Sequence, residues 1–84
     1  MKLTVRYFAV LRARAGVAAE VVSWDGPAPD VARLREHLAS RAPALGGLLR
    51  SDSLLVAVNR EYAAGETPLR DGDEVAFLPP VTGG

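Results

Sequence analysis

The sequence DVARLREHLAS, residues 30–40, carries the clearest structural pattern in the chain. Its apolar residues Val31, Leu34 and Leu38 recur at positions i, i+3 and i+7, so they lie on one face of a helix. The aspartate that opens the stretch is a residue type preferred as an N-cap, and Pro43 forbids continuation beyond the end. The pattern therefore predicts one main amphipathic helix, from the residue after the cap to about Ser40.

Shorter segments with strand patterns flank this helix. In Lys2–Phe8, alternate residues are apolar, which predicts a half-buried strand with Leu3, Val5 and Tyr7 on one face. Further strands are expected in residues 17–24, 54–58 and 75–79, with a short helix in 9–15 and a helical turn in 43–50. Strands on both sides of one main helix indicate an α+β fold rather than a doubly wound sheet.

The helix must bury its apolar stripe on one face of the sheet, which accounts for Leu3, Val5, Val75 and Phe77. Alternation then places Phe8 and Leu78 on the opposite face. No second helix is available to cover that face, and an exposed apolar pair there indicates a docking surface. The alternative is that the segment 9–15 or a loop folds over the pair.

Composition excludes several classes of function. The 84 residues suit one domain, and ten basic residues balance ten acidic ones, so neither nucleic acid nor an anionic membrane is an expected partner. No targeting or membrane-spanning segment is visible, and we expect a cytoplasmic protein. Cysteine is absent, and the single histidine, His37, has no partners at metal-ligand spacing, so no metal site is expected.

The chain ends in the sequence PPVTGG, residues 79–84, which predicts an extended, flexible tail rather than another strand. Two prolines remove backbone donors, and two glycines carry no Cβ, so the last peptide units fit a narrow slot. We expect a folded domain in residues 1–79 and a tail in 80–84 that offers a carboxylate to another protein. The only lysine is Lys2 and no glycine-rich loop precedes a helix, so a phosphate-binding loop is not expected.

Three segments together resemble the small subunit of molybdopterin synthase. They are Phe8–Arg12, Val58–Glu61 and, most specifically, Leu69–Gly84 with its DGDEVAFLPPVTGG ending. The sequence differs at Ala13, where that family often has glutamate. The resemblance implies a β-grasp, ubiquitin-like fold with a mixed sheet of four to five strands on one main helix.

The resemblance also implies a sulfur carrier and its partners. A ubiquitin-activating-type adenylyltransferase would use ATP to adenylate the Gly84 carboxylate, which then becomes a thiocarboxylate; this chain itself would bind no cofactor. The sulfur would pass to cyclic pyranopterin monophosphate in the large synthase subunit, within a heterotetramer. Residues implied in tail insertion are Pro80, Val81, Thr82 and Gly83, and those implied in docking are Phe8, Tyr62 and Leu78.

Two other functions remain open at this point, besides a β-grasp interaction module whose tail does nothing. One is a sulfur carrier for another pathway, such as thiamine synthesis. The other is a ubiquitin-like modifier joined to protein lysines through Gly84. Both would begin with the same adenylation of the terminal carboxylate. Only the resemblance to the molybdopterin synthase subunit therefore favours that function over these two.

Overall fold

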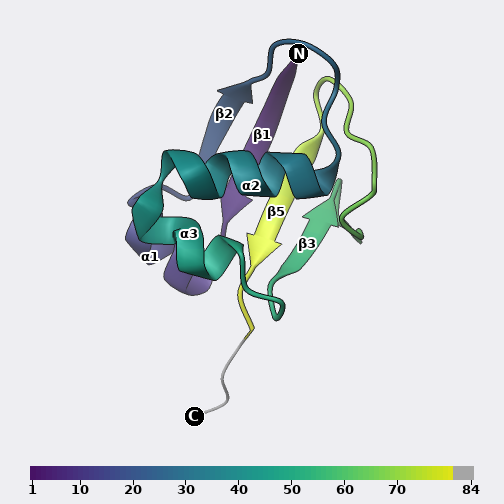
Figure 1. The fold of residues 1–84 in the computed structure, drawn as a ribbon. Helices are drawn as coiled ribbons and strands as arrows, with labels where there is room; N and C mark the ends of the chain where they lie inside the picture. Colours follow the sequence, from purple (N-terminus) through teal and green to yellow (C-terminus); the bar gives the residue numbers. More distant parts are fainter. Residues whose placement is uncertain (81–84) are drawn as a thin grey trace.

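The computed structural model describes residues 1–80, which contain three helices and five strands. The elements are β1 (Lys2–Tyr7), α1 (Ala9–Ala15), β2 (Ala19–Ser23), α2 (Val31–Arg41), α3 (Pro43–Leu49), β3 (Leu55–Val58), β4 (Glu61–Tyr62) and β5 (Glu74–Leu78). The strands form one five-stranded sheet in the order β2-β1-β5-β3-β4 (Figure 1). This is the β-grasp arrangement that the resemblance implies.

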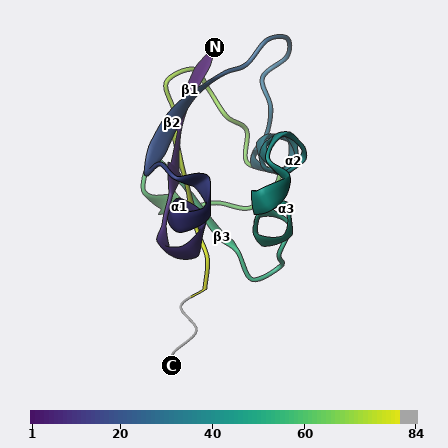
Figure 2. The ribbon, with the colours of Figure 1, turned by 90° about the vertical axis from the view of Figure 1, so that its left-hand side faces the viewer.

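The sheet is mixed because two of its three inner strands, β1 and β5, run in the same direction. β1 pairs with β5 in parallel, while the β1–β2, β3–β5 and β3–β4 pairs are antiparallel. α2 crosses one face of the sheet, and α3 packs beside it (Figure 1). Figure 2 shows α2 and α3 in a layer on one side of the sheet, with α1 at the end where β1 finishes. Among residues 1–80, no helix covers the other face of the sheet.

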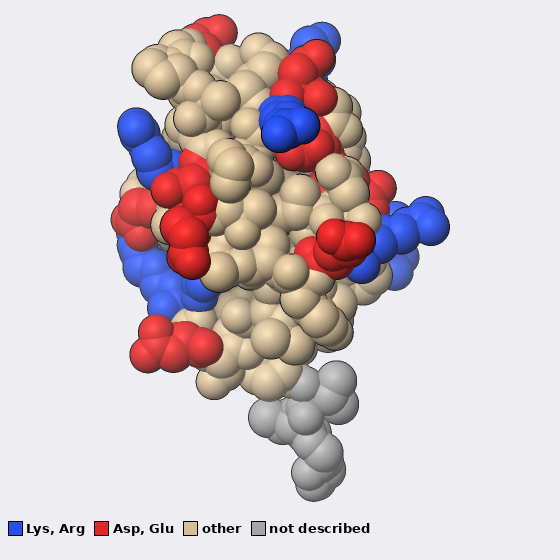
Figure 3. Space-filling model, turned by 90° about the vertical axis from the view of Figure 1, so that its right-hand side faces the viewer, with Lys and Arg blue, Asp and Glu red and all other residues tan. Residues whose placement is uncertain are grey.

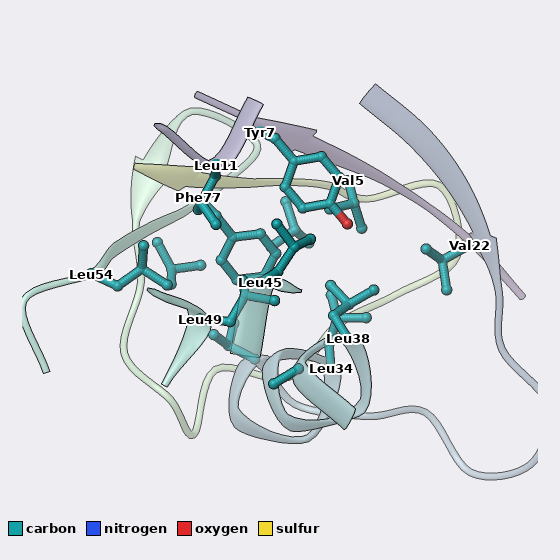
Figure 4. Packing of buried hydrophobic residues seen from close by; sticks show 14 of the residues in the cluster. Val5, Tyr7, Leu11, Val22, Leu34, Leu38, Leu45, Leu49, Leu54 and Phe77 are labelled. Atoms are coloured by element: carbon teal, nitrogen blue, oxygen red, sulfur yellow. The ribbon is translucent and has the colours of Figure 1, made fainter. Parts of the chain in front are cut away.

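The core lies between that sheet face and the helices (Figure 4). Leu3, Val5 and Tyr7 of β1 are all buried, as their alternation predicts. They meet the buried stripe of α2, and Leu11 brings α1 into the same cluster. The remaining fully buried side chains include Leu34, Leu38, Leu49, Leu69, Val75 and Phe77.

The main helix begins where its cap predicts. Asp30 has an extended backbone, and its Oδ1 accepts a hydrogen bond from the Arg33 amide at 2.8 Å. The loop after β4 satisfies two further amides, because the carbonyls of Thr67 and Gly65 accept from Val31 and Ala32 at 3.0 and 2.9 Å. α2 therefore has its first amides paired, and it ends at Arg41, one residue past the expected end.

One strand was not expected as a separate segment. Asn59 and Arg60 have φ values of 49° and 71°, which is the geometry of a two-residue hairpin turn. The chain therefore returns along β3 as β4, which is only two residues long. A strand of two residues is too short to show an alternating pattern of apolar and polar residues in the sequence. The Asn59 amide also donates a 2.8 Å hydrogen bond to the Glu74 carbonyl, which fixes this turn beside β5.

A buried tyrosine links the sheet to the end of α2. The Tyr7 hydroxyl donates to Glu20 Oε2 at 2.7 Å, and Arg41 Nη2 donates to Glu20 Oε1 at 2.7 Å. Tyr7 is 1% exposed. Burial, together with the neighbouring Glu20 carboxylate, raises the pKa of the Tyr7 hydroxyl well above its ordinary value.

This raised pKa predicts a loss of stability in alkali. Tyrosine ionises near pH ~10 in the unfolded chain but not in the folded one, so the free energy of unfolding should hold below pH ~10 and fall above it. We expect Tyr7→Phe to show a shallower fall, measured by urea denaturation from about pH 8 to about pH 11. Exposed Tyr62 serves as the control, because Tyr62→Phe should leave the alkaline fall unchanged. If the free energy of unfolding fell equally steeply with pH in Tyr7→Phe and in the unchanged protein, this prediction would be contradicted.

Candidate partner-docking site

The uncovered face of the sheet carries a row of four residues that the strand register aligns. Arg6 of β1 lies opposite Ala76 of β5, Ala76 opposite Ala57 of β3, and Ala57 opposite Tyr62 of β4. Directly paired residues on neighbouring strands project from the same face. Two alanines therefore lie in the middle of this row, with long side chains at both ends.

The small side chains leave a hollow of about 330 Å³ on this face, which we call the docking hollow. Its lining residues are Arg6, Phe8, Ala57, Arg60, Tyr62, Glu74, Ala76 and Leu78. The three residues that the resemblance implies in docking are all among them, although they come from three distant segments. Tyr62 is 76% exposed and Phe8 is 38% exposed.

Phe8 and Leu78 lie at the end of the hollow where β1 and β5 finish. Phe8 is the first residue after β1, and its amide donates to the Phe77 carbonyl at 3.3 Å. Leu78 ends β5 and pairs with Leu55 of β3, which is 50% exposed on the same face. Pro80 is exposed just beyond, and the tail residues Val81, Thr82, Gly83 and Gly84 lie outside the described residues.

Charged side chains border the hollow instead of filling it. Arg6 Nη1 lies 3.8 Å from Glu74 Oε1, and the Arg6 guanidinium lies 5.6 Å from the centre of the Phe8 ring. The guanidinium therefore neutralises a carboxylate and stacks against the aromatic ring. Figure 3 views the molecule from the side of β3, edge-on to the sheet, and shows charged side chains of both signs interspersed with uncharged atoms.

The segment 9–15 was the alternative cover for the exposed apolar pair. α1 does not fold over Phe8 and Leu78, because it turns its buried residue, Leu11, into the core. Sequence reasoning missed Ala57, Ala76 and Arg6 as parts of the site. Alternation places Arg6 with Phe8, and Ala76 with Leu78, on one face, but it does not mark either as part of a site. Only the register shows that Ala57 lies beside Ala76.

A second hollow, of about 440 Å³, lies beside the β3–β4 hairpin. Its polar lining is already engaged in turns: Asp73 accepts from the Asn59 side chain at 2.9 Å and from the Arg70 amide at 2.8 Å. These bonds agree with the expected turn chemistry of residues 69–73, where Gly72 has a φ of 86°. Two of its polar side chains, Asn59 and Asp73, therefore hold the turns that border this hollow.

Within residues 1–80, no group of three or more His, Cys, Asp or Glu side chains is placed to hold a metal ion. His37 lies edge-on to Trp24, with ring centres 5.1 Å apart. No helix among these residues has the length and apolar character needed to cross a membrane.

A family model described as the ThiS family matches residues 5–84, which include the terminal Gly-Gly. The chain belongs to the ThiS family. Curated relatives make the relationship more specific. The molybdopterin synthase sulfur carrier subunit of Escherichia coli is 43% identical, over 98% of this chain and 99% of its own length. The protein of the same name from Haemophilus influenzae is 39% identical over the same shares.

Solved structures of ThiS-like proteins agree with the fold. SAMP1, a small archaeal modifier protein from Haloferax volcanii, is 33% identical, covers all of both chains and has a TM-score of 0.83. A complex of subunits 1 and 2 of molybdopterin-converting factor from Helicobacter pylori contains a chain with 27% identity and a TM-score of 0.68, again over all of both chains. This ThiS-family chain thus has relatives named as sulfur carriers and as protein modifiers.

Proposed function

We propose that this chain is the sulfur-carrier subunit of a molybdopterin synthase. The observation that carries the proposal is the similarity to named sulfur carrier subunits, which extends over nearly the whole chain at 43% and 39% identity. The ThiS family model also runs through Gly84. The residue that does the chemistry is thus within the matched length.

In this proposal the chain supplies the sulfur-bearing carboxyl group, and other proteins act on it. The Gly84 carboxylate attacks the α-phosphate of ATP in a ubiquitin-activating-type partner, releasing pyrophosphate and forming an acyl-adenylate. A sulfur nucleophile then displaces AMP, leaving a thiocarboxylate. The thiocarboxylate gives its sulfur to cyclic pyranopterin monophosphate. ATP would be held by the partner, and the site of action would be cytoplasmic.

The proposed division of labour separates a docking domain, residues 1–79, from a tail, residues 80–84. From Pro80 to Gly84, five extended residues span at most about 18 Å, enough to enter a buried site on another protein. The docking hollow lies beside the start of that tail, at Leu78. The large subunit would cover the hollow while the tail enters its active site, in an assembly with two copies of each subunit.

An intact-mass measurement tests the carrier chemistry. We expect the chain, coexpressed with its activating enzyme and a sulfur source, to gain the mass of one sulfur in place of one oxygen on its C-terminal peptide. Protein expressed without the activating enzyme provides the control. An unmodified terminus in cells that are making the cofactor would contradict the proposal.

The likeness to SAMP1 supports one alternative, a modifier joined to other proteins. In that case Gly84 would be recovered in an isopeptide bond to target lysines, and little thiocarboxylate would accumulate. Digestion of cell extracts and mass spectrometry of branched peptides separates the two functions. The chain could instead give its sulfur to another acceptor, such as a thiamine precursor. In that case the thiocarboxylate would form and be consumed even in cells that lack the large synthase subunit.

Charge placed in the docking hollow should weaken binding of the large subunit. Phe8→Asp or Leu78→Asp would bury an unpaired carboxylate in the complex, and we expect at least a ~10-fold weaker Kd by calorimetry. Val21→Asp is the matched control, because Val21 is 63% exposed on the edge strand β2 and does not line the hollow. Unchanged affinity for both hollow variants would remove the docking assignment.

A further inference from the structure

The two edges of the sheet differ in their chemistry. At one edge, β4 is only two residues long and carries Glu61, and short, charged edge strands resist pairing with other chains. At the other edge, β2 is five residues long. Figure 2 looks toward this edge, with β2 beside β1 and α1 beyond its end. β2 therefore lacks the protection that β4 has.

The hydrogen bonds at both ends of the β1–β2 pair show which backbone groups of β2 face outward. Met1 and Trp24 exchange two hydrogen bonds, at 3.0 and 2.8 Å, and the Tyr7 amide donates to the Ala18 carbonyl at 2.9 Å. In an antiparallel pair, bonded and non-bonded positions alternate. The β2 residues whose N–H and C=O groups point away from β1 are therefore Ala19, Val21 and Ser23.

The side chains of these three residues present no charge. Val21 is 63% exposed, and Ala19 and Ser23 are exposed beside it. The one charged residue of the strand, Glu20, projects toward the helices, where Tyr7 and Arg41 each bond it at 2.7 Å. A strand that pairs with β2 would contact small or apolar side chains. It would also meet the backbone N–H and C=O groups of β2 that point away from β1.

We propose that β2 is a self-association edge, at which two copies of this chain pair antiparallel about a two-fold axis at Val21. Each Val21 would exchange both backbone hydrogen bonds with Val21 of the second copy. Ala19 would do the same with Ser23 of the second copy, and Ser23 with Ala19. The two sheets would then form one continuous sheet, with the helices of both copies on the same side.

A second copy fits this edge because the bonding positions are symmetric about Val21. A two-fold interface brings each residue opposite its symmetry mate, so charged residues at the centre would repel each other. Here the centre is Val21 against Val21, and each Glu20 already has Arg41 as its counterion. Pairing of two five-residue strands buries less than the ~1,200 Å² of a stable interface, so the dimer should be reversible. The docking hollow stays uncovered.

The test is sedimentation of the purified full chain over a range of concentrations. We expect the average mass to rise from one chain toward two, and Val21→Lys to remain at one. Leu55→Lys is the matched control: Leu55 is 50% exposed on the same sheet face, but β3 lies inside the sheet, so its variant should still dimerise. Circular dichroism should show both variants folded.

Amide hydrogen exchange supplies an independent readout at single residues. With rising concentration, the Ala19, Val21 and Ser23 amides should gain protection, while the Val22 amide, already directed at β1, should not change. A single-chain mass at every concentration would overturn the proposal. So would a dimer that persists in Val21→Lys, or one that Leu55→Lys disrupts, because the contact would then lie elsewhere.

Discussion

Deleting Gly84 is expected to abolish sulfur transfer while leaving the melting temperature of the domain unchanged. The deletion keeps a terminal carboxylate but moves it about 3.3 Å back along the chain. A reacting group misplaced by ~1 Å can already lose ~100-fold in rate, so we expect at least that loss. The folded domain should not respond, because the core is complete at β5 and chain ends outside it add little stability.

Two variants separate chain length from the identity of the last residue. Gly84→Ala keeps the length and adds one methyl group, so it should retain more transfer than the deletion. Sulfur transfer is measured by single-turnover formation of molybdopterin with the large subunit, and stability by thermal unfolding. Full activity of the shortened chain would show that the terminal carboxylate is not the loaded group. A marked drop in melting temperature would mean that the end of the chain is part of the fold.

Replacing Phe77 by alanine should remove much of the stability of the domain. Phe77 is fully buried, and its ring lies 6.4 Å from the Tyr7 ring at an interplanar angle of 22°. Truncating a buried phenylalanine costs about 3–5 kcal/mol, because the cavity collapses only in part. Domains have about 5–15 kcal/mol in total, so the variant should be close to unfolding. Urea denaturation measures the change.

Leu78 provides the control for Phe77, since it is the next residue on β5 and faces the opposite side of the sheet. Leu78→Ala removes a half-buried side chain from the docking hollow, and we expect a loss of less than about 1.5 kcal/mol in stability. Its main effect should be weaker binding of the large subunit. Comparable losses of stability in the two variants would contradict the assignment of one face to the core and the other to docking.

The elements that the sequence predicts well are those whose signals are local. The helix of residues 31–41 has a capping side chain, an apolar stripe and a proline beyond its end, all within reach of one another. The strand segments were expected in the right places, with ends that differ by one or two residues. Those ends depend on where pairing with another strand stops. β4 was missed for the same reason, because only its partner β3 defines it.

The sequence by itself determined which side chains share a face in the strands that it predicts, and how the main helix begins. These follow from the period of the backbone and from residues close together in the chain. The tertiary structure alone decided that Ala57, Ala76 and Tyr62 lie side by side, and that β2 is an edge. Register and strand order arise from contacts between distant segments, which no local pattern encodes.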